Sequence, residues 1–266
     1  MRPRNIAKRT NTTAPARPAP VEGGDGPVVA RATDYPDRHL ISAHWHPRAQ
    51  LLYARRGIMT VTTEAGIFVV PPQRAVWVPA RLVHEVRASG RLEMRSLYID
   101  EAAAPGLPRG CCVVTVSPLL RELILAATAM APSLPAGGRA AHVTALILDE
   151  IRAQRSSPLH LPEPRDGRLR RIAAALRAAP GDGRTLAAWG RLVGASARTL
   201  ARRFQAETGL SFARWRQQAR LLEALVRLAG GAAVTGVALD LGYESPSAFI
   251  AMFRRALGTT PGRYFG

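Results

Sequence analysis

The stretch LGYESPSAF occupies residues 241–249, and FRRALGTTP follows at residues 253–261. Ser245 and Pro246 form a helix start signal, because serine caps a helix N-terminus and proline fits its first turn. Apolar side chains recur at helical spacing after this signal and in a shorter segment before Gly242. The stretch therefore predicts two helices joined by a tight turn.

A second pair of helices with the same organisation lies upstream. Thr185 is the predicted cap of a helix over residues 186–193, and residues 194–196 form a turn before a helix over residues 197–208. A longer helix over residues 212–229 joins the two units. It spans about 27 Å at about 1.5 Å per residue, on the order of the ~34 Å between successive major-groove faces of DNA. One chain can therefore reach two adjacent grooves.

The two quoted stretches, together with Tyr264, resemble the signature of the AraC/XylS family of transcription regulators. Residues 200–204 (LARRF) and 207–209 (ETG) resemble the first unit of the same family's domain. The resemblance covers about residues 165–266. It implies an all-α DNA-binding domain with two helix-turn-helix units, in which the second helix of each unit enters a major groove.

The resemblance also implies which side chains contact DNA. The base-reading positions are Arg198, Ala201, Arg202 and Gln205 in the first unit, and Pro246, Ser247, Ala248, Ala251 and Met252 in the second. Helical spacing also turns Thr199 outward beside Arg198, so it is a further candidate for DNA contact. Arginine can form two bonds to guanine and glutamine can pair with adenine, whereas the second set has a single polar side chain. The remaining basic positions are expected at phosphates or on the solvated surface, namely Arg203, Arg254, Arg255 and Arg263.

The charge of the chain favours a polyanionic partner. The formal net charge is +18, and Lys8 is the sole lysine among 37 basic residues. A GC-rich coding sequence also favours arginine over lysine, so the position of the charge is more informative than its type. Residues 165–266 contain 17 arginines and 6 acidic residues, a net charge of +11, which is consistent with a DNA-binding surface.

The first half of the chain has a β pattern. Short apolar runs at regular spacing predict a β-barrel or sandwich; they cover residues 51–53, 58–61, 67–70, 76–78 and 94–99. The dipeptides at residues 56–57, 65–66 and 89–90 each contain glycine and predict turns. Trp77 is expected in the core.

The spacing of three histidines resembles a cupin barrel. The cupin pattern places two histidines and a glutamate on one strand and a third histidine on a later strand, so that the side chains converge inside the barrel. Here these positions hold His44, His46 and His84, and Gln50 stands where glutamate is usual. The resemblance implies either a divalent-metal site, such as zinc, nickel or iron, or a hydrogen-bonded histidine cluster.

Residues 111–164 are predicted to link the two halves. A helix capped by Ser117 covers about residues 118–131, and a second helix follows Gly138. The apolar stripe of the second helix is either a packing surface or a dimerisation surface. Three prolines between residues 158 and 164 predict an interdomain linker, and the Pro-, Gly- and Arg-rich residues 1–27 predict a disordered tail.

Several features favour a cytoplasmic protein. There is no apolar run of 18 residues, and prolines between residues 15 and 20 interrupt any secretory signal. Cys111 and Cys112 are adjacent, so they form neither a loop-closing disulfide nor a CxxC pair.

The sequence thus predicts an α+β multidomain protein. A cupin-like β-barrel sensor covers residues 28–110, linker or dimerisation helices and a linker cover 111–164, and the DNA-binding domain covers 165–266. We expect a non-enzymatic, homodimeric regulator that binds promoter DNA, responds to a small-molecule or metal effector and has RNA polymerase as a candidate partner.

Two alternative functions remain open at this point. The first is a metal-dependent cupin enzyme, dioxygenase-like, fused to a helical domain. Gln50 in place of glutamate and the lack of an evident acid–base pair argue against it. The second is nonspecific coating of RNA or DNA, which explains the charge but not two spaced helix-turn-helix units.

Overall fold

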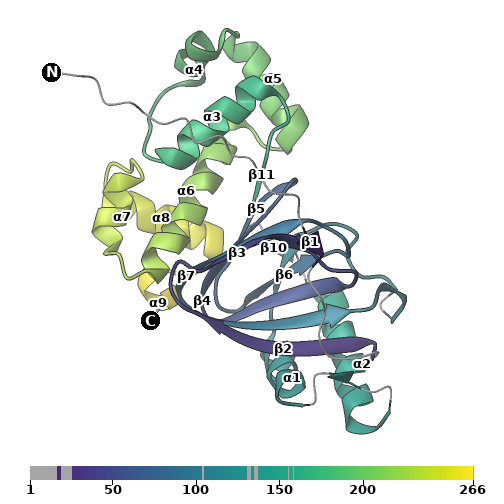
Figure 1. Ribbon diagram of the computed structural model, residues 1–266. Coiled ribbons are helices and arrows are strands. Elements are labelled where there is room, and N and C mark those ends of the chain that lie inside the picture. The colour runs from purple at the N-terminus through teal and green to yellow at the C-terminus, as the bar shows by residue number, and fades with distance from the viewer. Residues whose placement is uncertain are drawn as a thin grey trace, which may run out of the picture.

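The computed structural model describes residues 17–18, 26–103, 105–130, 133–134, 137–154, 156–157 and 159–265. It contains a β-sheet domain with two helices on one side and an all-α domain on another side (Figure 1). The strands are β1 (Arg17–Pro18), β2 (Val28–Tyr35), β3 (Leu40–Trp45), β4 (Ala49–Thr63), β5 (Gly66–Val70), β6 (Arg74–Val78), β7 (His84–Ile99), β8 (Cys112–Thr115), β9 (Ser133–Leu134), β10 (Ser156–Ser157) and β11 (His160–Pro162). A short 3₁₀ helix covers Glu101–Ala103.

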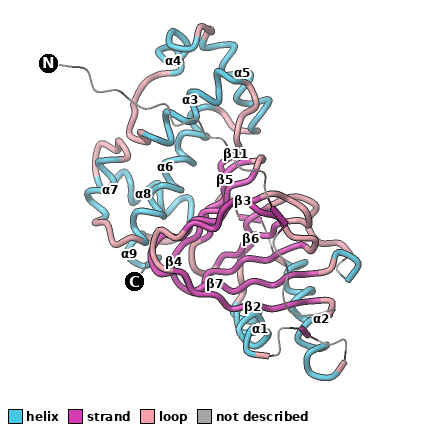
Figure 2. Tube along the Cα trace, in the orientation of Figure 1, coloured by secondary structure: helices cyan, strands magenta, loops and turns pink. Residues whose placement is uncertain are grey.

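The strands form one bent sheet of the cupin-like type (Figure 2). Its main path runs β1-β3-β7-β4-β6-β8-β10, with β5 and β11 branching from β4, and β2 and β9 branching from β7. Among the described residues, no strand pairing joins the two ends of this path. The sheet is therefore open, and the predicted closed barrel is corrected to an open cupin-like sheet.

The bend of the sheet comes from its two longest strands. Strands β4 and β7 pair along most of their lengths, and their register shifts between Ala54 and Ile58. Gly57 lies at this bulge with φ +77°, a backbone conformation that glycine adopts without strain. The turns predicted at residues 56–57 and 89–90 are thus wrong, because both glycines lie inside continuous strands. The turn predicted at residues 65–66 is confirmed between β4 and β5.

Successive side chains of β4 enter two different hydrophobic cores, because neighbours on a strand point to opposite faces. Leu51 and Tyr53 pack with helices α1 (Pro118–Ala129) and α2 (Gly138–Ala153), whereas Leu52 and Ala54 face the other core. Trp77 is buried with α1 and α2, as predicted. Its indole Nε1 donates a hydrogen bond to the Pro108 carbonyl at 2.7 Å.

The helical domain follows the predicted pattern closely. Its helices are α3 (Gly167–Ala178), α4 (Leu186–Val193), α5 (Ala197–Thr208), α6 (Phe212–Ala229), α7 (Val234–Asp240), α8 (Pro246–Leu257) and α9 (Pro261–Phe265). The predicted caps are confirmed, since each side-chain oxygen accepts a hydrogen bond from a backbone N–H of the first turn; they are Ser117, Thr185, Ser196, Ser211 and Ser245. Gly194 ends α4 in the left-handed conformation, with φ +69°, as the turn requires.

The segment predicted as an interdomain linker is a strand of the sensor sheet. Strand β11 pairs with β5, and the His160 ring stacks on Phe68 with ring centroids 4.2 Å apart. Leu161 is buried. Connector helix α6 then packs on β4, β5, β7 and β11, so the two domains share one hydrophobic core. A proline-rich composition predicted a spacer here, but backbone pairing along the β5 edge fixes the segment.

Most of the predicted tail, residues 1–16 and 19–25, lies outside the described residues. Within that tail, Arg17–Pro18 differ from the prediction of disorder, because they pair in parallel with β3. In the described part of the chain, no helix is long and apolar enough to cross a membrane.

Substitution of Gly57 by alanine is expected to destabilise the sensor domain. An alanine Cβ at this position lies 2.5 Å from the Arg91 carbonyl oxygen, and the φ angle is strained for any other residue. We expect the free energy of unfolding to fall by about 2 kcal/mol or more, measured by urea denaturation. Gly106→Ala is the control, because its φ is also positive but no atom lies within 4 Å of the added Cβ. Equal losses in both variants would contradict the close-contact explanation.

Candidate functional site

Helix α5 presents two free arginines to solvent. Arg198 and Arg202 are exposed and lie one helical turn apart on the same face. Within the described residues, neither side chain forms a hydrogen bond or ion pair with the protein. Ala201 is also exposed between them. This face therefore holds two unengaged guanidinium groups that can donate to an external acceptor.

The two other predicted reading residues of α5 are engaged locally. Gln205 Nε2 donates to the carbonyl of Gly209 at 3.0 Å, across the end of the helix. Thr199 Oγ1 lies 2.9 Å from the hydroxyl of the capping residue Ser196. Each of these side chains has part of its hydrogen-bonding capacity used within the protein, so the two arginines are the better candidates for base reading.

Arg203 has a structural partner that the sequence did not reveal. Its Nη1 lies 2.6 Å from Asp166 Oδ2 and 3.7 Å from Glu207 Oε1. Asp166 is the N-cap of α3, where it accepts bonds from two backbone N–H groups. These backbone bonds and Arg203 lower the pKa of Asp166, outweighing the opposing effect of burial. Arg203 thus ties α5 to the start of α3.

The second recognition helix, α8, exposes small side chains. Ser247, Ala248 and Ala251 are exposed, and Pro246 is half-buried in the first turn. Met252 is the exception, because its side chain is 6% exposed and packs in the domain core with Phe253. The prediction that Met252 contacts bases is therefore corrected: helical spacing turns this position inward. The exposed first half of α8 therefore offers only one hydroxyl and apolar groups to a base edge.

The arginines of this domain divide into two groups. Those bound to other protein groups are Arg177, Arg184, Arg203, Arg216, Arg220 and Arg227. Among the exposed arginines for which the described structure shows no protein partner are Arg191, Arg214, Arg254, Arg255 and Arg263. The second group leaves Arg254 and Arg255 available for the phosphate contacts predicted for α8.

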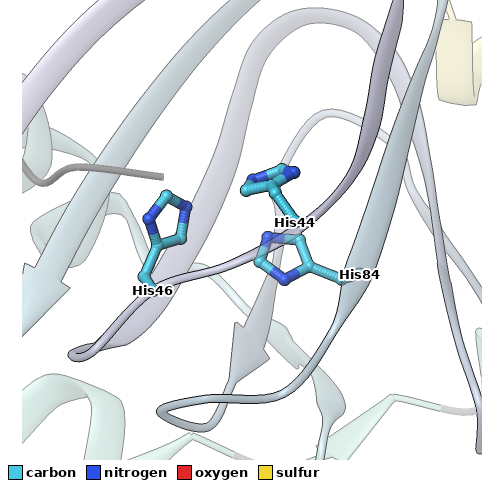
Figure 3. A group of neighbouring side chains, drawn as sticks. All are labelled: His44, His46 and His84. Atoms are coloured by element: carbon cyan, nitrogen blue, oxygen red, sulfur yellow. The ribbon is translucent and has the colours of Figure 1, made fainter. Parts of the chain in front are cut away.

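The three histidines of the sensor domain converge, as their spacing predicted (Figure 3). His44 and His84 are register partners on β3 and β7, and His46 follows directly after β3. The ring centroids of His44 and His84 are 4.4 Å apart, and one ring nitrogen from each of the three histidines lies within 4.8 Å of the others. Such spacing allows three imidazoles to surround one ion.

Backbone carbonyls orient two of these rings. His44 Nδ1 lies 2.7 Å from the Ser42 carbonyl, and His84 Nδ1 lies 2.9 Å from the Leu82 carbonyl. A carbonyl only accepts, so each Nδ1 carries a proton and each neutral ring keeps its lone pair on Nε2. His84 Nε2 is buried with no hydrogen-bond partner. Burial, aided by His44 and His46, lowers the pKa of His84 to about 4, so this ring is neutral at pH 7.

Gln50 lies beside this cluster on β4. It is paired in register with Tyr98, whose ring packs against His46 with centroids 4.9 Å apart. The Gln50 side chain is buried, and its Oε1 has no hydrogen-bond partner. Gln50, at the position where glutamate is usual, therefore offers a neutral amide oxygen in place of a carboxylate. The site combines imidazole nitrogens with an amide oxygen and holds no carboxylate among the clustered residues.

Two known families match this chain. The family described as AraC-like ligand binding domain matches residues 26–193, and the family described as Helix-turn-helix domain matches residues 189–266. The first match alone spans more than half of the chain. The chain belongs to the AraC family of transcription regulators. The resemblance seen in residues 165–266 is therefore confirmed.

Individual proteins are also similar to this AraC-family regulator. The HTH-type transcriptional regulator NimR of Escherichia coli (strain K12) is 38% identical over 221 residues, which are 83% of this chain and 81% of NimR. The HTH-type transcriptional regulator RipA of Corynebacterium glutamicum is 36% identical over 104 residues, which are 39% of this chain and 31% of RipA. Among solved structures, fatty-acid-bound ToxT of Vibrio cholerae aligns at a TM-score of 0.38 with 9% identity, over 90% of this chain and 94% of ToxT.

The family settles the choice between the functions that the sequence left open. An AraC-family protein with a ligand-binding domain is a DNA-binding transcription regulator and not an enzyme. The cupin-enzyme alternative is therefore wrong. Within this regulator, the histidine cluster belongs to the ligand-binding domain and α5 and α8 belong to the DNA-binding domain.

Proposed function

We propose that this regulator binds promoter DNA in the cytoplasm as a homodimer and reads its operator mainly through α5. The observation that supports this proposal is the pair of exposed, unengaged side chains of Arg198 and Arg202. Each can form a bidentate contact with guanine. Helix α8 then contributes Ser247 and apolar contacts, with Arg254 and Arg255 on phosphates. RNA polymerase at the same promoter is the proposed protein partner, and in vitro transcription with and without the regulator tests it.

Arg202→Ala is expected to weaken binding to the operator in a base-specific way. We expect a loss of ~1–3 kcal/mol that is confined to one base position. Arg203→Ala is the matched control, since its half-exposed ion pair contributes under about 1 kcal/mol to folding and reads no base. The measurement is competition between upstream intergenic DNA, its single-base variants and scrambled DNA, across a salt series. A loss spread evenly over all sequences would reject the reading role of Arg202.

The proposed dimer contact is on α1 and α2. Leu119 on α1 is 50% exposed and Leu146 on α2 is 46% exposed, so each helix keeps an uncovered apolar side chain beside the face that packs on the sheet. Pairing of two chains removes such side chains from water. The domain boundaries at residues 111 and 164 are part of the same proposal, and the second boundary lies two residues after β11 ends at Pro162.

Leu146→Glu is expected to dissociate the homodimer. A carboxylate in an apolar contact loses hydration without gaining a partner, so the dimer dissociation constant should rise at least about tenfold. Sedimentation equilibrium measures this constant. Leu239→Glu, at a leucine of similar exposure on α7, should leave it unchanged. A dimer that is equally stable in both variants would place the contact elsewhere.

We propose two kinds of ligand for the sensor domain, a divalent transition metal or a small organic effector. The residues fit such an ion, because three imidazole nitrogens lie within 4.8 Å of one another and His84 Nε2 is buried without a partner. His44, His46 and His84 would hold the ion, as zinc accepts three histidines with water in the fourth position. A bound ion would cross-link β3 to β7. A small organic effector in the same domain is the other form of this proposal.

Metal binding is expected at one equivalent per chain after dialysis against Zn²⁺, measured by elemental analysis. His84→Ala removes a ligand and should lose the metal. His142→Ala is the matched control, because His142 is exposed on α2, away from the cluster. Wild-type protein that retains no metal, or His84→Ala protein that retains it, would contradict the site and leave the organic effector.

A further inference from the structure

The sensor domain contacts the DNA-binding domain mainly through the connector helix α6, which packs on β4, β5, β7 and β11 (Figure 1). At the first end, Glu163 forms an ion pair with Arg177 of α3. Next to it, the indole Nε1 of Trp215 donates a hydrogen bond to the Pro162 carbonyl at 2.8 Å. Trp215 is fully buried, so loss of this bond leaves a polar group unsatisfied in the core.

The middle of the contact is the face of α6 that follows Trp215. Ala219, Leu222 and Val226 line a cavity of about 220 Å³ together with Thr60 and Ser89 of the sensor sheet. Ile67, Val69 and Leu161 add to the apolar part of this lining, so the sheet and the connector helix face each other across a largely apolar surface. Contact therefore continues over most of the length of α6.

The last part of the contact involves the C-terminal helix. Tyr264 and Phe265 of α9 pack against the shared core. Burial raises the pKa of Tyr264, and Arg74 at the start of β6 is close enough to oppose this shift. Helix α9 packs in turn on α6 and α8. The sensor domain thus contacts α6, the helix that joins the two helix-turn-helix units and on which α9 packs.

This contact does not cover the recognition faces. Arg198 and Arg202 of α5 and Ser247 and Ala248 of α8 are exposed while the domains are docked. A sensor domain that blocked DNA by covering it would bury these side chains. The observed arrangement instead leaves the reading surfaces open and restrains the helices behind them.

We propose that the docked sensor domain is a brace, which holds the two helix-turn-helix units in the relative position needed to bind two adjacent grooves. Trp215 and Glu163 are the positioning residues of this brace. This inference rests on the proposed two-unit DNA binding. When both units are held in place, binding of the first raises the effective concentration of the second, and less conformational freedom is lost on binding.

The experiment compares two double variants of the full chain. Trp215→Phe with Glu163→Gln removes one indole–proline hydrogen bond and one ion pair from the domain contact. Trp77→Phe with Glu93→Gln removes the same two kinds of interaction from within the sensor domain, namely Trp77 to Pro108 at 2.7 Å and Glu93 to Arg55 at 3.3 Å. Hydrogen exchange of the β11 amides reports docking. Affinity is measured for the full operator and for a fragment with the segment bound by the first unit alone.

If the sensor domain is a brace, the variant of the domain contact should lose affinity for the full operator only. In Trp215→Phe/Glu163→Gln, β11 should exchange faster and affinity for the full operator should fall about tenfold, while affinity for the one-unit fragment stays unchanged. The matched control should change none of these. Unchanged or higher affinity for the full operator, equal losses on both DNAs, or unchanged exchange of β11 would overturn the brace. Failure of the wild-type protein to prefer its operator over scrambled DNA would instead overturn the proposed function.

Discussion

The architecture depends on the pairing of β11 with β5, because this short strand is where the chain leaves the sensor sheet and enters the DNA-binding domain. Its backbone hydrogen bonds fix the segment to the sheet edge, and the buried Trp215 indole bonds the carbonyl of Pro162. A proline at the end of an edge strand is compatible with this arrangement, since its missing N–H faces away from the ladder. The two domains consequently pack as one body instead of being joined by a free spacer.

The two helix-turn-helix units share a backbone plan but differ in chemistry. Capping serines, Ser196 and Ser245, start both recognition helices in the same way. Helix α5 then exposes two guanidinium groups, while α8 exposes a hydroxyl and methyl groups. Direct readout needs donors and acceptors at base edges, which is the reason for proposing that α5 carries most of the sequence discrimination. In the same proposal, helix α8 supplies surface complementarity and charge, which position a unit without reading many bases.

The helices could be predicted from the sequence because their determinants are local. Caps, apolar periodicity and terminal glycines all act within a few residues, so the bounds of α4, α5, α6 and α8 agree with the pattern. The histidine cluster was predictable for a different reason, since its spacing is fixed by alternation on strands. What could not be predicted depends on partners far away in the sequence. Gly57 lies at a bulge in the pairing of β4 with β7, and Arg203 forms an ion pair with Asp166. Strand β11 pairs with β5, which lies almost a hundred residues earlier in the sequence.

Strand β7 connects the histidine cluster to the contact between the two domains. His84 begins β7, and Ser89 lies five residues later, about 17 Å along an extended strand, where it faces α6 across the interdomain cavity. A ligand that moves His84 therefore acts on a strand whose next segment bears on the connector helix. A ligand shifts the balance between two arrangements only by binding one of them more tightly. Strand β7 is the element that carries both a residue of the histidine cluster and a residue of the domain contact.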